Sequence, residues 1–425
     1  MESQDKQIPT GILSRVYALS VTAAAPLVAV GLACGARGRR RYAERFGSWG
    51  EVSRSEWWMH GASVGEVQGL LPLIVEVRAR SPQEAILLTS TSPTGLDRAG
   101  ESVNTKRLLP IDVPWCVRRA LSSVDTKRFV LAETELWPVL LRELLTRGMP
   151  CHIVNGRISD YTLRRYQILR SVFSPLLERV SSVCVASEGQ RDRYRALGVR
   201  PDVIHVTGHT KYDSAPKVRE HISRVELSRE FFGENDTDAP IVTLGSVRPG
   251  EESVWLEAVQ ALNRNERRLK VILAPRHMEK VSYFTEVLRK SGLSWARWSE
   301  RELGASCEVV LLDVMGRLEE AYAVASLAFI GGTLVDIGGH NPLEAAMYKV
   351  PVVVGPYTSV ISDVLDDMRS AQALTELQVG EKVHPLLERV VHGDPALREA
   401  GERGYRVWSH HRGAAQRVAS VIEHG

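Results

Sequence analysis

Short apolar runs alternate with helical stretches along nearly all of the chain after residue 50, and this alternation constrains the fold more than any other feature. Strands separated by helices pair in parallel, with the helices crossing over the faces of the sheet. The alternation weakens over residues 212–238 and then restarts, so the sequence predicts two doubly wound α/β lobes. Strands are expected at residues 57–60, 85–90, 106–111, 128–132, 151–155 and 182–186 in the first lobe, and at 241–246, 270–275, 308–313, 327–332 and 350–356 in the second.

The length of 425 residues exceeds what one ordinary core needs, since a domain takes about 150 residues. We expect a membrane anchor with a basic flank at 1–46, an N-terminal Rossmann-like lobe at 47–215, a linker at 216–238, a C-terminal Rossmann-like lobe at 239–405 and a C-terminal helix at 406–425. Two such lobes place a ligand cleft at the carboxyl ends of their sheets. Glycosyltransferases, nucleotide-sugar epimerases and periplasmic-type binding proteins all share this architecture.

Composition excludes several classes of protein. A formal net charge of +3 gives no whole-molecule reason to expect nucleic acid as a partner. Five cysteines lie far apart without a C-x-x-C pair, which favours reduced thiols in the cytoplasm over disulfides or a zinc site. The sequence DTD at 236–238 matches the Asp-x-Asp of metal-dependent sugar transferases, but it lies in a turn-rich segment and is interpreted as a solvated turn. We therefore expect no metal site.

The N-terminus carries a membrane signal. Residues 16–36 form a run of 21 residues without a charge. As a helix, this run would reach about 31 Å at ~1.5 Å per residue, near the hydrocarbon thickness of a bilayer. Ala and Gly dilute the hydrophobicity and Pro26 interrupts the segment, so a full span and a shallow anchor both fit. The basic flank, which keeps the following lobe cytoplasmic and attracts anionic headgroups, comprises Arg37, Arg39, Arg40, Arg41 and Arg45. A cleaved signal peptide is the competing interpretation, and this cluster opposes it.

The stretch HGASVGEV at 60–67 has two readings. Ser63 and Glu66 have the spacing of a capping box, which predicts a helix start at Ser63. Gly65 costs about 1 kcal/mol in a helix relative to Ala, so its presence indicates that something approaches this backbone closely. Glu66 could then serve as a catalytic base, with the helix dipole keeping its carboxylate ionised. We predict that Ser63 caps the helix while Glu66 faces the cleft.

The second lobe contains a candidate nucleotide site in GGTLVDIGGHNPLEAA at 331–346. Asn341 can cap a helix, Pro342 suits its first position and Glu344 falls at the third. The glycines allow close backbone approach, so the turn is either a phosphate site at a helix N-terminus or a plain cap. Arg276 in APRH and Gly316 in MGRL follow two further strands. The spacing of these turns fits neither a dinucleotide fingerprint nor a P-loop.

Acidic and basic residues also follow strands of the first lobe. Glu133 and Glu135 come directly after a strand, where acidic residues are common because they suit the dipole of a following helix. Lys211 lies close to the expected linker. Exposed lysines are common, so these residues predict no chemistry on their own.

Taken together, the motifs resemble those of one family, the 3-deoxy-D-manno-octulosonic acid (Kdo) transferases. They run in the family's order from the N-terminal anchor to near residue 360: HGASVGE, TSTSPTG, LPIDVP, ETELWP, NGRIS, TGHTKYD, GEES, APRH, MG and GGHNPLEAA. The resemblance implies a GT-B fold, with two Rossmann-like doubly wound lobes facing a cleft and an N-terminal membrane-anchoring helix. It also implies transfer of Kdo from CMP-Kdo to a lipid A precursor, lipid IVA, at the cytoplasmic side of the inner membrane during lipopolysaccharide biosynthesis.

The resemblance also assigns roles to residues. Glu66 matches the general base, and Glu133 and Lys211 match residues that stabilise the transition state. The segments that match the CMP-binding residues comprise Pro275, Arg276, Met315, Gly316, Arg317, Asn341, Pro342, Leu343 and Glu344. The chain departs from the family at His209 and Thr210, where Asn and an apolar residue are commoner, and at Arg317, where Glu is frequent.

The implied reaction inverts the configuration at the anomeric carbon and needs neither metal nor cofactor. Two alternatives remain at this point: another GT-B enzyme that uses a different nucleotide sugar, and a non-catalytic lipid-binding relative. The expected partners are CMP-Kdo, the lipid A precursor and anionic lipid headgroups of the membrane.

Overall fold

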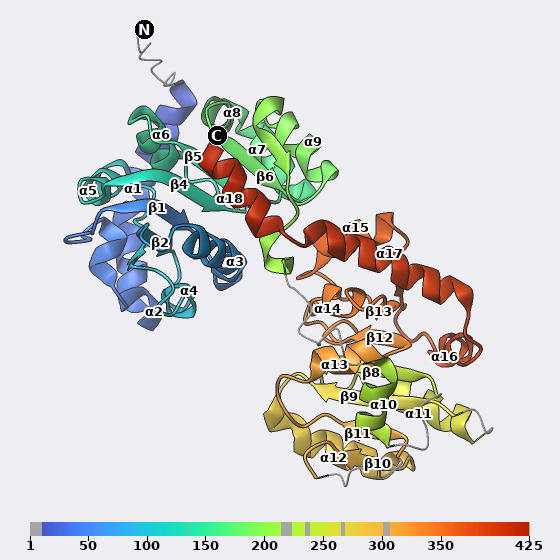
Figure 1. The fold of residues 1–425 in the computed structure, drawn as a ribbon. Helices are drawn as coiled ribbons and strands as arrows, with labels where there is room; N and C mark the ends of the chain where they lie inside the picture. Colours follow the sequence, from blue (N-terminus) through green and yellow to red (C-terminus); the bar gives the residue numbers. More distant parts are fainter. Residues whose placement is uncertain are drawn as a thin grey trace. The chain divides into compact units, whose positions relative to one another are not determined.

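The computed structural model describes residues 11–133, 135–213, 223–233, 239–264, 268–300 and 307–424. The chain divides into two compact units, residues 1–213 with 411–425 and residues 214–410. Each unit contains one seven-stranded parallel sheet with helices packed against it, as Figure 1 shows. The two doubly wound lobes predicted from the alternating pattern are thereby confirmed.

In the first unit the strand order is β3-β2-β1-β4-β5-β6-β7, and all neighbours pair in parallel. The strands are β1 (Ser55–His60), β2 (Ile86–Ser90), β3 (Thr105–Leu108), β4 (Thr126–Ala132), β5 (Cys151–Gly156), β6 (Ser182–Val185) and β7 (Ile204–Val206). The helices are α1 (Ile12–Cys34), α2 (Ala36–Arg39), α3 (Val64–Arg80), α4 (Pro93–Arg98), α5 (Pro114–Leu121), α6 (Pro138–Thr146), α7 (Asp160–Ile168), α8 (Arg170–Leu177), α9 (Glu188–Ala196) and α18 (Ala414–His424), with short 3-10 turns η1 (Tyr42–Phe46), η2 (Pro201–Val203) and η3 (Thr210–Tyr212).

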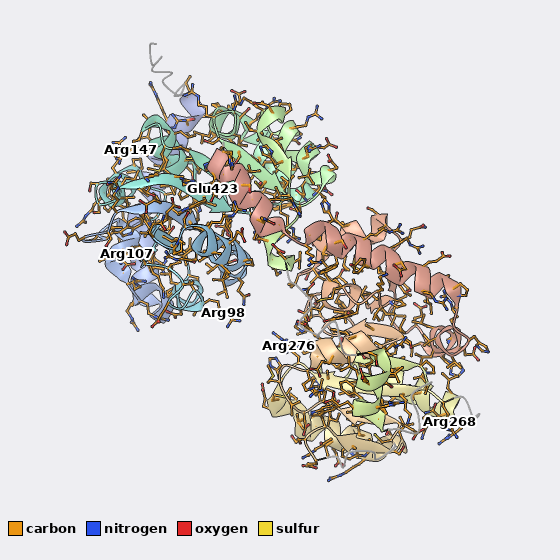
Figure 2. All side chains as sticks on the ribbon, in the orientation of Figure 1. Arg98, Arg107, Arg147, Arg268, Arg276 and Glu423 are labelled. Atoms are coloured by element: carbon orange, nitrogen blue, oxygen red, sulfur yellow. The ribbon has the colours of Figure 1, made fainter. Side chains whose placement is uncertain are left out.

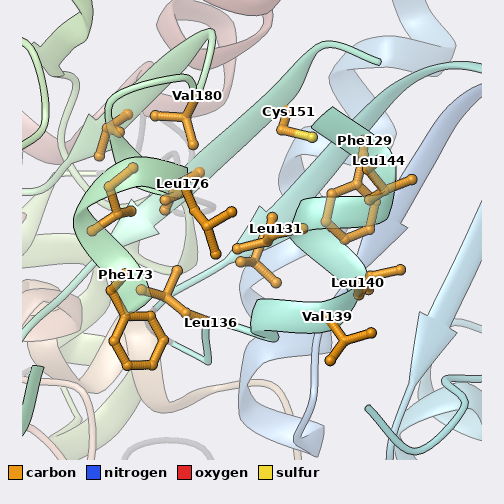
Figure 3. Close-up of a cluster of buried hydrophobic side chains, with 14 of the residues drawn as sticks. Phe129, Leu131, Leu136, Val139, Leu140, Leu144, Cys151, Phe173, Leu176 and Val180 are labelled. Carbon is orange, nitrogen blue, oxygen red and sulfur yellow. The ribbon is translucent and has the colours of Figure 1, made fainter. Parts of the chain in front are cut away.

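Both faces of the first sheet are covered, because side chains alternate along each strand. Trp58 and Phe129 point into a core shared with α5, α6, α8 and α9. Trp57 and Met59 point to the opposite face, into a core shared with α3 and α18. Figure 3 shows part of the first core, where side chains of α6 and α8 pack against those of β4 and β5.

In the second unit the order is β10-β11-β9-β8-β12-β13-β14, again all parallel. The strands are β8 (Ile241–Val247), β9 (Lys270–Pro275), β10 (Trp295–Arg297), β11 (Val309–Leu311), β12 (Leu327–Ile330), β13 (Val352–Val354) and β14 (Leu374–Glu376). The helices are α10 (Arg224–Phe232), α11 (Ser253–Asn263), α12 (Val281–Ser291), α13 (Leu318–Val324), α14 (Leu343–Ala346), α15 (Ser362–Ser370), α16 (His384–Val391) and α17 (Pro395–His411), with the 3-10 turn η4 (Met278–Lys280). Helix α10 lies within the segment expected to be a linker.

The last helix of the chain returns to the first unit. Val418, Ala419 and Ile422 of α18 are buried against α3 and the sheet face that contains Trp57. Arg80 of α3 also contacts this helix, since its guanidinium pairs with Glu423 at 2.9 Å and donates to the Gln416 carbonyl at 3.0 Å. Both units therefore depend on residues from the C-terminal part of the chain.

Helix α1 is the one helix among the described residues that is long and apolar enough to cross a membrane. Its most apolar 18 residues have a mean hydropathy of 1.9, and only 6% of that window is buried. The helix continues through Pro26. It also contacts the first unit, because Ala25 is buried against Val113 and Cys116, and the Tyr17 hydroxyl donates to Asp112 Oδ2 at 3.3 Å.

We predict that Ile422→Ala lowers the free energy of unfolding of the first unit by about 2–5 kcal/mol, the usual cost of removing a large buried aliphatic side chain. The matched control is Glu423→Ala, which removes only a surface ion pair worth about 0–1 kcal/mol. Urea unfolding followed by tryptophan fluorescence measures both. Equal losses in the two variants would contradict the packing of α18 as a core element.

Candidate active site

Glu66 lies in the tight turn between β1 and α3. Ser63 is the N-cap of α3, and its hydroxyl accepts a hydrogen bond from the Glu66 amide at 3.2 Å, which confirms the predicted cap. The Glu66 carboxylate turns back and accepts from the Ala62 amide, with 2.8 Å between N and Oε2. Only 7% of Glu66 is exposed. The residue thus takes part in the turn and presents a buried carboxylate at the carboxyl end of β1.

Ala62 is also hydrogen-bonded through its carbonyl group, to residues at and just after the end of β2. Its carbonyl oxygen accepts hydrogen bonds from Ser90 Oγ at 3.1 Å and from Thr91 Oγ1 at 2.7 Å. These two residues belong to the TSTSPTG motif, whose role the sequence left unassigned. Because Ala62 is bonded at both its amide and its carbonyl, the position of the Glu66 carboxylate is well determined.

The structure raises the pKa of Glu66 to about 7. Burial is the largest cause, and the negative charges of Glu133 and Glu135 add to it. The hydrogen bonds that the carboxylate accepts from the Ala62 amide and from the Ser63 side chain lower the pKa, but by less than burial and the like charges raise it. The expectation that the helix dipole keeps this carboxylate ionised is therefore wrong, because burial and like charge raise its pKa to about 7.

Gly65, which the sequence linked to a close approach, leaves open space in the structure. A Cβ atom built there would meet only the Ser63 hydroxyl, at 3.8 Å. The protein's own packing therefore does not require glycine at this position, and space remains beside Glu66 for a bound molecule.

Glu133 follows β4 directly, and its backbone is held in an uncommon conformation. Its φ is +56°, in the left-handed region that non-glycine residues rarely occupy. The Glu133 amide donates to the Val154 carbonyl at 2.8 Å, and the Tyr194 hydroxyl donates to the Glu133 carbonyl at 3.1 Å. Such conformations persist where surrounding contacts enforce them, often at functional sites. The negative charge of Glu133 is one of the causes that raise the pKa of Glu66.

Lys211 reaches the same region because its segment is bonded to α3. Thr210 donates from its hydroxyl to the Gly69 carbonyl, one helical turn after Glu66. The Asn155 side chain donates to Thr210 Oγ1 at 2.8 Å and accepts from the Thr210 amide at 2.9 Å. Lys211 itself is exposed. The departure from the family's commoner residue at 210 thus supplies a hydroxyl that ties the Lys211 segment to α3.

The predicted residues of the second unit follow the carboxyl ends of its strands. Pro275 ends β9 and is buried, whereas Arg276 is exposed, with its side chain at the surface of the unit in Figure 2. Met315 and Gly316 follow β11, and Asn341 follows β12 through a glycine-rich loop. In parallel sheets the carboxyl ends of the strands meet at one edge, where such folds bind ligands.

Arg276 belongs to a group of basic side chains. Arg248 Nη1 lies 2.5 Å from His277 Nε2. Burial, together with the nearby charges of Arg276, Arg248 and His277, lowers the pKa of His340 to about 4. The sequence identified Arg276 but missed the other three as a group, because they come from three separate turns. The Arg276 and Arg248 guanidinium groups create a positive potential suited to a phosphate.

Arg317 is engaged within the protein. Its guanidinium lies 4.3 Å from the Trp298 ring centre and forms ion pairs with Glu230, at 2.8 Å, and with Glu320. Of the segment 315–317, Met315 is 76% exposed and Gly316 has a φ of +88°. A nucleotide would therefore meet the backbone of this turn and the Met315 side chain more readily than the Arg317 guanidinium.

The helix expected at NPLEAA is shorter than its motif indicates. Asn341 Oδ1 accepts from the Leu343 amide at 3.0 Å, as a cap does, but α14 begins at Leu343 and extends for one turn. A single turn has only a small dipole. The glycines have a conformational cause, since Gly338 and Gly339 have φ values of +98° and +89°. Glu344 lies near Tyr322, whose phenol it affects electrostatically.

A buried carboxylate that the sequence did not single out holds this glycine-rich loop. Glu251, in the motif GEES, is 0% exposed. Its side chain accepts from the backbone amides of Gly332, Thr333 and Leu334 at 2.8, 3.0 and 2.9 Å, and from Arg248 at 2.8 Å. Glu251 therefore joins the turn that carries Arg248 to the loop that leads to Asn341.

Within the described residues there is no group of three or more His, Cys, Asp or Glu side chains that could hold a metal ion. The DTD sequence at 236–238 lies outside the described residues.

Residues 40–214 of the chain match the family model described as 3-deoxy-D-manno-octulosonic-acid transferase (kdotransferase). The chain is 31% identical over 396 residues to the 3-deoxy-D-manno-octulosonic acid transferase of Haemophilus influenzae, covering 91% of this chain and 92% of that one. It is 32% identical over 328 residues to the Chlamydophila psittaci enzyme of the same name, covering 74% and 73%.

A solved structure is similar in fold. The UDP-GlcNAc 2-epimerase from Neisseria meningitidis bound to UDP-GlcNAc superposes with a TM-score of 0.56 at 11% sequence identity, covering 87% of this chain and 100% of that one. Together with the two Rossmann-like units, this likeness confirms the predicted GT-B fold class.

We predict that Glu251→Gln destabilises the second unit and weakens nucleotide binding. An amide offers one acceptor oxygen in place of two, so backbone donors lose their partner at a cost of about 1–3 kcal/mol each. Hydrogen exchange should show lost protection at the amides of residues 332–334. The control is Glu257→Gln on the exposed side of α11, which should change neither quantity. Unchanged protection in Glu251→Gln would contradict the assigned bonds.

Proposed function

This chain belongs to the 3-deoxy-D-manno-octulosonic acid (Kdo) transferase family, and from that premise we propose that it transfers Kdo from CMP-Kdo to a sugar hydroxyl of a lipid A precursor, lipid IVA. Membership makes it a glycosyltransferase of lipopolysaccharide biosynthesis. The observation that carries the proposed mechanism is the Glu66 carboxyl, held by the Ala62 amide with a pKa of about 7.

Glu66 is the general base of the proposed reaction. The acceptor hydroxyl attacks the anomeric carbon of Kdo and gives up its proton to the Glu66 carboxylate as the new C–O bond forms. A base works best when its pKa lies near the operating pH, because it is then ionised and still accepts a proton readily. Burial beside Glu133 supplies that pKa. The open space at Gly65 leaves room for the acceptor.

Glu133 and Lys211 act on the sugar. As the bond to the leaving group breaks, positive charge develops at the anomeric carbon, and the Glu133 carboxylate stabilises it. Lys211 carries an ammonium group suited to the carboxylate of Kdo itself. Both residues are held at the carboxyl edge of the first sheet through Val154 and Gly69, the backbone partners described above.

The second unit binds CMP in this proposal. The bond between the anomeric carbon and the phosphate oxygen breaks with its electron pair moving to CMP, and the anomeric configuration inverts. Arg276 and Arg248 stabilise the charge on the departing phosphate. Pro275, the 315–316 turn and the Asn341–Glu344 segment contact the nucleotide. The two guanidinium groups take the role that a metal ion has in other sugar transferases.

Membrane attachment through α1 at the cytoplasmic side of the inner membrane completes the proposal. The apolar length of α1 supports it. The basic flank contributes fewer unpaired cations than its sequence indicates, since Arg40 pairs with Asp97 at 3.2 Å and Arg41 with Glu44 at 3.0 Å. Arg39 remains exposed for anionic headgroups.

We predict that Glu66→Gln lowers kcat by about 10²- to 10⁴-fold, the usual contribution of a positioned base. Affinity for CMP should stay unchanged, because the nucleotide binds to the second unit. The assay follows Kdo addition to lipid IVA by mass spectrometry. Glu76→Gln on the same helix is the matched control and should retain activity.

The wild-type pH profile checks the same role independently. Since Glu66 must be ionised to accept a proton, kcat/KM should fall about tenfold per pH unit below its pKa of about 7. A rate that stays constant between pH 5 and 8, or a Glu66→Gln variant with near-normal turnover, would remove Glu66 as the base.

We further predict that chelation of divalent ions leaves the rate of the wild-type enzyme unchanged, because basic side chains stabilise the leaving phosphate. The rate is measured with EDTA and then with added Mg²⁺. Loss of activity in EDTA that Mg²⁺ restores would contradict this part of the mechanism.

A further inference from the structure

A pocket of about 330 Å³ lies in the first unit, between α1 and the loops at the carboxyl end of the sheet. One wall is a face of α1 that runs from Tyr17 to Leu32. The opposite wall is residues 109–113, after β3, together with Trp137 at the start of α6. Its volume is within the range of ligand sites in proteins, about 300–1,000 Å³.

Some polar groups of this pocket are hydrogen-bonded within the protein, and two donors are not. Asp112 is already occupied, since its carboxylate accepts from the Val139 and Leu140 amides at 3.0 and 2.9 Å. Arg45 donates from Nη1 to the Thr91 carbonyl at 3.1 Å. Arg45 Nε and Trp137 Nε1, however, are buried without an acceptor in the described part of the chain. Buried donors without partners are unfavourable, so two donors in an otherwise apolar pocket lack an acceptor oxygen.

The pocket lies next to the candidate base. Thr91 lines it and donates from Oγ1 to the Ala62 carbonyl at 2.7 Å, and the Ala62 amide donates to Glu66 at 2.8 Å. Two hydrogen bonds therefore connect the pocket wall to the Glu66 carboxylate. The wall of the pocket is thus joined to the turn that carries the candidate base.

We propose that this pocket binds one acyl chain of the acceptor lipid, with the carbonyl oxygen of that chain accepting from Arg45 Nε and Trp137 Nε1. An alkyl chain with an ester or amide carbonyl is the ligand that supplies both the apolar volume and the missing acceptor. Helix α1 then forms a wall of the acceptor site as well as an anchor. The inference rests on the proposed function, because it assumes that an acylated sugar is the acceptor.

The test narrows the pocket from its open side. Ala24 lines the pocket and is exposed, so Ala24→Trp adds bulk without replacing a core residue. Ala23→Trp is the matched control, since Ala23 is exposed on the same helix but does not line the pocket. Val28→Trp, also exposed and lining, is a second test variant. Each is assayed in detergent micelles with tetra-acylated lipid IVA and with the fully de-acylated sugar.

The measured quantity is the preference, kcat/KM for the tetra-acylated acceptor divided by kcat/KM for the de-acylated one. Each methylene removed from an apolar site costs roughly fourfold in affinity, so excluding several should lower the preference at least tenfold in Ala24→Trp and Val28→Trp. Ala23→Trp should keep the wild-type preference.

The outcomes separate the two proposals. A wild-type enzyme that uses neither acceptor contradicts the proposed function. A wild-type enzyme that uses both acceptors equally well, or lining variants that keep the wild-type preference, contradicts the acyl-chain pocket and leaves the function intact. If Ala24→Trp lowers turnover of both acceptors by the same factor, the pocket holds a membrane phospholipid or only supports the fold, and the inference is wrong.

Discussion

Buried carboxylates bonded to backbone amides organise the turns at the carboxyl edges of both sheets, and the candidate site depends on them. Glu251 accepts from four amides and joins two loops of the second unit. Asp112 accepts from two amides at the start of α6, and burial still raises its pKa to about 6. Glu66 accepts from the single amide of Ala62 and has a pKa of about 7. The carboxylate with the fewest amides is the one assigned to proton transfer.

The number of amide hydrogen bonds that a buried carboxylate accepts distinguishes a structural role from a chemical one here. A carboxylate whose lone pairs are filled by amides stabilises a loop and has little capacity left for a substrate. Glu66 has a second oxygen beyond the one bonded to Ala62, and a Cβ atom at Gly65 in the same turn would meet open space. The apolar pocket reaches Ala62 through Thr91, which donates to its carbonyl. Positioning of the base and recognition of the acceptor would therefore share residue Ala62.

Much of the fold could be predicted from the sequence, because central strands are continuous apolar runs: all seven residues of β8 are buried. Strands β7, β10 and β14 were missed because they lie at the edges of the sheets and are only partly buried, so they form no continuous apolar run. The return of α18 to the first unit could not be predicted either, because an amphipathic helix does not indicate which sheet it covers.

In the site, too, features that depend on neighbours in the sequence could be predicted, whereas features that depend on distant residues could not. Ser63 was predicted as a cap because its partner lies three residues away. The role of Glu251 was missed because its partners lie 81 to 83 residues further along the chain. The charge state of Glu66 was predicted incorrectly, since it depends on burial and on Glu133, which are properties of the folded chain.

The most direct test of the account is the difference in thermal stability between the wild-type protein and Glu66→Gln, measured from pH 4 to pH 9. The pKa of Glu66 is raised from 4.5 to about 7 on folding, so its neutral form favours the folded state. That contribution is fully present below pH 4.5 and is lost as the pH rises to about 7. The wild-type protein should therefore lose stability relative to Glu66→Gln over this window, by up to about 3 kcal/mol at ~1.4 kcal/mol per pKa unit, and the difference should stay constant above it. A difference that does not change with pH, or a wild-type protein that gains stability over the window, would contradict the claim that Glu66 is a buried carboxyl whose pKa is raised to about 7.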